Sequence, residues 1–361
     1  MSTETGAGAA NPWGVYGHDE AVEMLRRAIA SGHLAHAYLV SGPRGVGKEA
    51  LARRLAQTLV SPSPEDRTSP DRSTRAARQL EAGGSPDVER VAIGGVCDES
   101  SHQHESDNST RIRICQVRRL ERLASLAPFA APRRIFIIDG ADDLQPEAAH
   151  ALLKTLEEPP AGVLIVLLAR DPDALLPTIR SRCQSITLRP MPRPALMEAL
   201  RESGVEDGQA EVLARLAHGR YGLAMRMHAD PSMAVLRESA VEEAQRIVRA
   251  GRNERFDVAE RLGGAWYRER ESVLTTIDLW REWWRDVLLA SAGVEDPPPV
   301  EVAFVAAACP PGEAVRALRA VQTAREHLLV NTNAQLALEV MMLDLPVLDL
   351  PAPVKEERVP V

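Results

Sequence analysis

Short, continuously apolar runs punctuate the first half of the chain. Those at 135–139 and 163–169 have the length and composition of strands buried on both faces of a sheet, and 37–40 is a shorter run of this kind. Between the runs, apolar residues recur every three or four positions. This predicts helices at 17–31, 48–59, 116–126 and 146–156, with further short strands at 88–93 and 184–188. Strands that alternate with helices predict an α/β fold, with a parallel sheet covered by helices on both faces.

The pattern changes after residue 190, where strand-like runs stop and helical periodicity continues alone. Helices are predicted at 194–203, 207–218, 221–229, 231–250, 266–290, 311–329 and 333–343. Three tryptophans, Trp280, Trp283 and Trp284, share one helix face. We favour burial of this stripe in an all-α core, with an exposed stripe at an oligomer interface as the alternative.

Two polar segments interrupt the α/β half. Residues 61–85, rich in Pro, Ser, Asp and Arg, are predicted to form a poorly ordered excursion. Residues 94–110 are predicted to form a loop. The sequence assigns no role to either segment.

Charge and composition narrow the classes of function. A net charge of −8 argues against a free-standing DNA-binding protein. The four cysteines are scattered without a pairing pattern, so a reducing, cytoplasmic compartment is expected. No stretch approaches the roughly 18 apolar residues that a membrane span needs. Residues 1–11 lack the apolar core of a signal peptide and are predicted to be a disordered lead.

A glycine-rich loop follows the first predicted strand. Its sequence has the G-x-x-x-x-G-K frame of a phosphate-binding P-loop, with Gly42, Gly45, Gly47 and Lys48. The position between a strand and a helix favours descent from such a loop over a plain glycine turn. In an active loop the next residue is Ser or Thr, whose hydroxyl binds Mg²⁺, but here it is Glu49. A carboxylate repels phosphates, so the sequence leaves ATP binding open.

The strand at 135–139 ends in a second remnant of nucleotide chemistry. Asp139 stands where the aspartate of an ATPase supports Mg²⁺. The next position, which carries a water-polarising glutamate in active enzymes of this kind, is Gly140. Asp142 and Asp143 lie two and three residues further on and are not expected to replace that glutamate. The general-base position is therefore predicted to be empty.

One predicted helix, 116–126, is rich in arginine. Arg118, Arg119 and Arg122 give it a basic surface. We favour a solvated helix face, and contact with DNA phosphates is the alternative.

Longer motifs carry a family resemblance. They are Ser-Pro-Asp at 85–87, IIDGAD at 137–142, LLKTLEEPP at 152–160, TIRSRC at 178–183 and NTNAQLALE at 331–339. With these motifs, about 12–345 resembles the bacterial DNA polymerase III clamp-loader subunits of the AAA+ class. The resemblance implies an AAA+ α/β domain, a small helical lid, a helical collar that joins subunits in a ring, and a flexible tail, at 12–188, 189–235, 236–347 and 348–361.

The resemblance also implies a role for Arg182. In this family the arginine of Ser-Arg-Cys acts in trans, where its charge offsets charge developing on the γ-phosphate of ATP in a neighbouring motor subunit. A structural salt bridge beside Cys183 is the alternative.

Four positions depart from the motor subunits of the family. Glu49 and Gly140 replace the Mg²⁺-binding hydroxyl and the catalytic glutamate, and Arg170 and Gly222 stand at the first and second sensor positions. These losses fit the non-hydrolysing delta-prime branch. Two alternatives stay open: an active motor subunit of the gamma/tau kind, and a regulatory subunit that binds ATP without turnover.

The partners and cofactors implied by the resemblance follow. The expected partners are gamma/tau and delta subunits, the sliding clamp, and primed DNA within the complex, with no membrane. Many relatives carry a four-cysteine zinc module after the P-loop helix. Between Lys48 and Cys97 this chain has no cysteine, so no zinc and no certain cofactor are expected.

Overall fold

A parallel sheet with strand order β2-β3-β4-β1-β5 organises the first half of the structure. The structure is a computed structural model that describes residues 11–99, 111–294, 300–329 and 333–350. The strands are β1 (Ala37–Ser41), β2 (Val88–Val91), β3 (Arg134–Asp139), β4 (Val163–Ala169) and β5 (Gln184–Thr187). β4 pairs with β1 on one edge and with β3 on the other, and all its residues are buried. This central position explains its unbroken apolar sequence.

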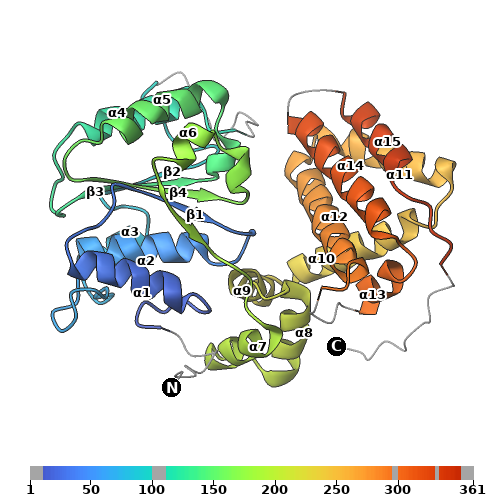
Figure 1. The fold of residues 1–361 in the computed structure, drawn as a ribbon, viewed down its shortest axis with the longest axis horizontal. Coiled ribbons are helices and arrows are strands. Elements are labelled where there is room, and N and C mark those ends of the chain that lie inside the picture. The colour runs from blue at the N-terminus through green and yellow to red at the C-terminus, as the bar shows by residue number, and fades with distance from the viewer. Residues whose placement is uncertain (1–10, 100–110, 295–299, 330–332, 351–361) are drawn as a thin grey trace. The chain divides into compact units, whose positions relative to one another are not determined.

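Helices cover both faces of the sheet, as Figure 1 shows. On one face lie α1 (Asp19–Ala30), α2 (Lys48–Val60) and α3 (Arg75–Glu81), and on the other lie α4 (Ile114–Ala124), α5 (Pro146–Glu157) and α6 (Pro177–Arg180). Alternate strand residues enter separate cores, because successive side chains on a strand point to opposite faces. Leu39 packs in the core that contains α4 and α5, whereas Tyr38 packs in the core that contains α1 and α2. The predicted α/β fold class is confirmed.

Three helices follow the sheet within the same compact unit, Met1–Ala229. They are α7 (Arg193–Glu202), α8 (Asp207–Ala217) and α9 (Tyr221–Ala229). Short 3-10 turns, η1 (Ala141–Asp143) and η2 (Pro172–Ala174), follow β3 and β4. The predicted division at 188 and 235 stays a prediction, and most of the lead at 1–11 and of the tail at 348–361 lies outside the described residues.

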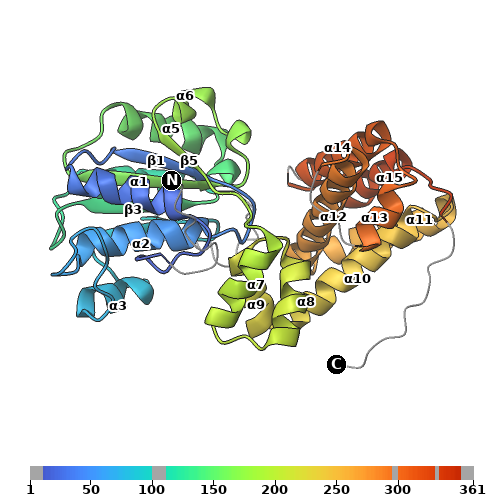
Figure 2. The same cartoon turned by 60° about the horizontal axis from the view of Figure 1, so that its bottom comes forward.

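The second unit, Asp230–Val361, contains only helices in its described part. They are α10 (Pro231–Ile247), α11 (Arg252–Trp266), α12 (Arg270–Ser291), α13 (Val300–Ala306), α14 (Pro311–Leu329) and α15 (Ala334–Asp344). Figure 2 shows α12, α14 and α15 side by side, and these helices contact one another in that order. The sequence did not predict α11 or α13. The tryptophan stripe is buried, as favoured: Trp280, Trp283 and Trp284 are all at most 3% exposed.

A buried arginine joins three helix ends in the second unit. Arg255 of α11 is 4% exposed. Its guanidinium donates to the carbonyls of Ile247, Met342, Leu345 and Pro346 at 2.6–3.0 Å. These carbonyls lie at or just past the ends of α10 and α15, where backbone acceptors lack helical partners. Arg255 therefore caps two helices from a third.

The excursion at 61–85 is ordered, so the prediction of poor order was wrong. It contains α3, and its first part is fixed by Asp66, which accepts bonds from Thr68, Ser69 and Arg26 of α1. The carbonyl of Thr68 also accepts a bond from the Trp13 indole at 2.8 Å. Polar composition concealed this order because hydrogen bonds hold the first part of the segment, and α3 buries only Ala77 and Leu80.

Candidate functional site

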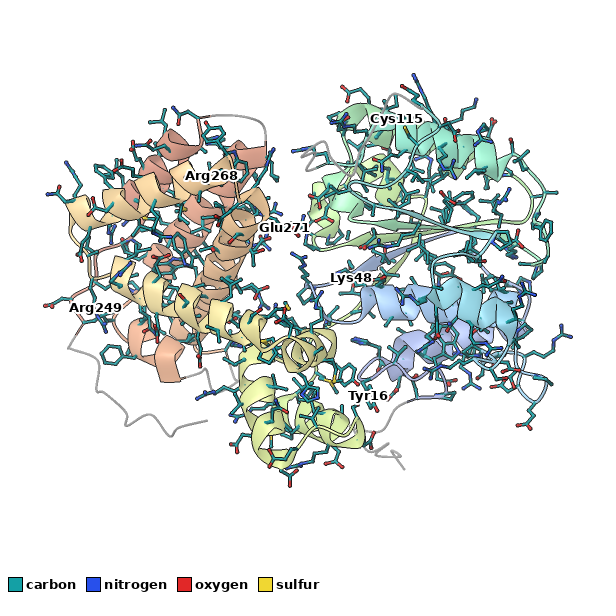
Figure 3. The ribbon with its side chains drawn as sticks, turned by 180° about the vertical axis from the view of Figure 1, so that it is seen from behind. Tyr16, Lys48, Cys115, Arg249, Arg268 and Glu271 are labelled. Carbon is teal, nitrogen blue, oxygen red and sulfur yellow. The ribbon has the colours of Figure 1, made fainter. Side chains whose placement is uncertain are left out.

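The P-loop joins β1 to α2 and is folded back on its own lysine. Lys48 begins α2, as Figure 3 shows. Its Nζ donates to the carbonyls of Gly42 at 2.6 Å and Pro43 at 3.0 Å. Burial lowers the pKa of Lys48 to about 8, although Asp142 and Asp139 act in the opposite direction. The lysine that would meet a phosphate thus bonds the backbone of its own loop.

A cluster of ion pairs around Arg90 lies where a P-loop enzyme holds its metal. Arg90 of β2 donates from Nη2 to Asp139 Oδ2 at 2.5 Å, and its Nε is 3.9 Å from Glu49 Oε1. Glu49 also pairs with Arg53, one turn along α2, at 2.5 Å. Glu49, at the position of the Mg²⁺-binding hydroxyl, and Asp139, at the end of β3, therefore both lie beside the Arg90 guanidinium.

The backbone conformation at position 140 favours glycine directly after Asp139. Gly140 has φ +87°, in the left-handed region where a residue with a Cβ is strained, and a Cβ built there would lie 3.3 Å from Asp143 Oδ2. The two acids beyond it are bound to Arg170: Nε to Asp142 at 2.9 Å and Nη2 to Asp143 at 2.8 Å. Asp142 and Asp143 are thus ion-paired with Arg170, and the empty general-base position stays a prediction.

Helix α9 contacts the P-loop directly. A Cβ built on Gly45 would lie 2.8 Å from Leu223 Cβ, and one built on Gly222 would lie 2.9 Å from the Gly45 carbonyl oxygen. Stacking of Tyr16 on Tyr221, with ring centroids 4.5 Å apart, adds a contact at the start of the same helix. An arginine at position 222, as in a second sensor, does not fit this approach.

Arg182 lies apart from the loop, on the turn between α6 and β5. Its Nη2 pairs with Glu157 Oε1 of α5 at 2.7 Å, and its Nη1 donates to the Thr178 carbonyl at 2.9 Å. The side chain is 34% exposed. Burial raises the pKa of the adjacent Cys183 thiol to about 12, so this sulfur stays protonated. Both an exposed functional role and a structural ion pair are compatible with this geometry.

The arginines of α4 are partly occupied by acids of the same chain. Arg119 pairs with Glu89 at 3.1 Å and with Asp98 at 2.7 Å, and Arg122 pairs with Asp98 at 2.6 Å. These arginines lower the pKa of Asp98 to about 2. Arg118 is exposed. The prediction of a DNA-contacting face stays a prediction.

The structure brings Lys48, Glu49 and Asp139 together at the carboxyl end of the sheet and leaves Arg182 and the arginines of α4 elsewhere. Sequence reasoning missed Arg90. The strand pairing, which sequence alone does not show, places it: β2 neighbours β3, and Arg90 pairs with Ile137, two residues before Asp139. Because side chains two apart on a strand share a face, Arg90 lies on the face of Asp139.

Comparisons with known proteins fit this arrangement. Residues 17–192 match the sequence profile of a family described as "DNA polymerase III, delta subunit". The DNA polymerase III subunit delta' of Bacillus subtilis is 26% identical over 275 residues, which cover 76% of this chain and 78% of that protein. These similarities support a DNA polymerase III clamp-loader subunit. Its delta' relative from Pseudomonas aeruginosa is 32% identical over 182 residues, or 50% of this chain and 51% of that protein.

Gamma/tau subunits of DNA polymerase III are also similar to this chain. The gamma/tau subunit of Mycobacterium tuberculosis is 34% identical over 187 residues, which cover 52% of this chain but 30% of that protein. A solved gamma subunit-related protein of Thermotoga maritima is 18% identical, with a TM-score of 0.42 over 89% of this chain and 97% of that one.

No helix in the described part of the chain is long and apolar enough to cross a membrane.

Proposed function

We propose that this clamp-loader subunit is of the delta-prime type: it does not hydrolyse ATP itself and helps to load the sliding clamp on primed DNA. The observation that supports this most is the pairing of its acids. Asp139 is paired with Arg90, and Asp142 and Asp143 with Arg170. No water-polarising carboxylate stands at position 140. The residues present do not fit a Mg²⁺–ATP complex, so no hydrolytic step runs through this loop.

Within this proposal, Arg182 acts on the ATP of a neighbouring gamma/tau subunit. Its exposure and its ion pair with Glu157, itself 49% exposed, support the role, because an exposed ion pair contributes about 0–1 kcal/mol and is readily exchanged for a phosphate. The guanidinium then stabilises charge on the transferring phosphoryl group in the transition state.

The remaining partners complete the proposal. A delta subunit, the clamp and primed DNA join the gamma/tau subunits in a cytoplasmic complex, in which the second unit acts as the collar. Arg118, Arg119 and Arg122 are the proposed DNA contacts. Arg119 and Arg122 would exchange Asp98 for phosphates, so their contribution would fall steeply with salt.

Turnover by the purified protein tests the first part. We expect no ATP hydrolysis above that of Lys48→Ala, measured as phosphate release. Hydrolysis that depends on Lys48 would instead support the gamma/tau-like alternative. ATP binding without turnover, measured by equilibrium titration with and without Mg²⁺, would support the regulatory alternative.

A reconstituted complex with gamma/tau and delta subunits tests Arg182. Arg182→Ala should leave assembly intact and lower turnover at the ATP site it serves by a factor on the order of 10³. Arg180→Ala is the matched control, because Arg180 lies two residues away and pairs with Asp173. If Arg182→Ala and Arg180→Ala give the same clamp- and DNA-stimulated rate, Arg182 is structural.

A further inference from the structure

We infer that the Arg90 guanidinium takes the place of the divalent cation that a metal-dependent P-loop binds. The guanidinium holds Glu49 and Asp139 together in the place where a metal-dependent relative would hold Mg²⁺. The inference adds a cause to the proposed loss of hydrolysis: the site is closed to metal by an arginine of its own sheet.

Two carboxylates share the Arg90 guanidinium. Glu49 stands at the hydroxyl position of the P-loop and Asp139 at the end of β3, and both approach the same Arg90 side chain, at 3.9 and 2.5 Å. The positive charge of Arg90 lowers the repulsion between them. A serine or threonine in place of Glu49 would bring only one carboxylate to this point.

The same geometry disfavours a metal ion. Mg²⁺ requires oxygen ligands at about 2.0–2.1 Å in octahedral geometry. A guanidinium bonded to Asp139 occupies the acceptor oxygen and repels a divalent ion. Arg90 is half exposed, at 54%, so it reaches the carboxylates from the surface rather than from the core, and its removal leaves no large cavity.

Arg90 and Arg53 are distinguishable in this arrangement. Arg53 contacts Glu49 from the next turn of α2, with no bond to Asp139 among the described contacts. Arg90 alone of the two approaches both carboxylates. Removal of Arg90 should therefore open a two-carboxylate cation site, whereas removal of Arg53 should not.

Binding of Mn²⁺ to the full chain, followed by electron paramagnetic resonance of the free ion, tests the inference. Arg90→Gln should bind one Mn²⁺ at least tenfold more tightly than the unchanged protein, and Arg90→Gln/Asp139→Asn should lose that gain. Arg53→Gln is the matched control and should resemble the unchanged protein. Arg90→Lys, which keeps a positive charge, should also exclude the ion.

Two results would overturn the inference. One is an Arg90→Gln protein that keeps its thermal unfolding midpoint but binds Mn²⁺ no better than before. The other is an unchanged protein whose Mn²⁺ binding is abolished by Asp139→Asn. Because no partner subunit is present, either result is independent of whether Arg182 serves a neighbouring ATP.

Discussion

At the scale of single residues, the loop keeps the sequence frame of an ATPase, but its charged residues bond to the protein: Lys48 to loop carbonyls and Asp139 to Arg90. The sequence revealed the frame and the misplaced Glu49, because both lie within a few residues of one another. It did not reveal that Lys48 bonds its own loop or that Arg90 reaches Asp139, because these contacts depend on backbone path and strand pairing. The sequence revealed the local motif, whereas the cation that we infer to replace the metal lies 41 residues beyond Glu49, at Arg90.

Lys48 offers a direct measurement of this redirected charge. The chain has only three lysines, Lys48, Lys154 and Lys355, so ¹³C-methylated amines are readily assigned by loss of one signal in Lys48→Arg. The Lys48 signal should titrate near pH 8 in the folded protein and near 10.4 in urea.

The sign of the stability effect follows from that difference. Between pH 8 and about 10.4 the unfolded chain binds more protons at Lys48 than the folded one, so this residue makes the protein more stable as pH rises through that window. A folded-state titration near 10.4 would show that the amine is solvated rather than buried against its loop.

At the scale of elements, α9 and the P-loop behave as one packed contact. The sequence predicted α9 within its observed bounds because its ends carry clear signals, but nothing in its pattern showed that Gly222 lies against Gly45. The approach requires glycine at 222, since a Cβ there would be 2.9 Å from a carbonyl oxygen.

Gly222→Arg should therefore destabilise the first unit. We expect a loss of about 1–3 kcal/mol in the free energy of unfolding, because the helix must move off the loop to admit the side chain. The measurement is urea unfolding followed by far-ultraviolet circular dichroism. Gly208→Ala is the matched control: Gly208 is also the second residue of its helix, and a Cβ there meets only ordinary contacts at 3.5 Å. Equal stability of the two variants would contradict the packing described.

At the scale of the whole molecule, the fold class was predictable, but helices α11 and α13 of the second unit were not. The sequence predicted β4 because burial on both faces of the sheet leaves no polar position in this strand. α11 was missed because its buried face includes Arg255, and because Gly263 breaks helical propensity. Gly263 is required by packing: a Cβ there would lie 2.9 Å from the Cα of Gln335 in α15. The sequence analysis left 251–265 unassigned, and tertiary contacts stabilise the helix there.

The distribution of tryptophan can give the second unit an optical reporter of its own. Trp13 belongs to the first unit and the other four tryptophans to the second, so Trp13→Phe restricts indole emission to the helical unit. In that background, Gly222→Arg should shift the dichroism transition but leave the fluorescence midpoint unchanged, if the two units unfold independently.

Arg255→Met should destabilise the second unit. It removes the guanidinium donor of four backbone carbonyls, of which Ile247 keeps a bond from the Ala250 amide. The free energy of unfolding should fall by about 1–3 kcal/mol, seen as a fluorescence midpoint at lower urea concentration. A fluorescence midpoint that also shifts in Gly222→Arg would mean that the units unfold together. The buried tryptophan stripe, which contributes packing to the folded protein, thus gives the second unit a fluorescence signal of its own in the Trp13→Phe background, whereas far-ultraviolet dichroism follows the helices of both units.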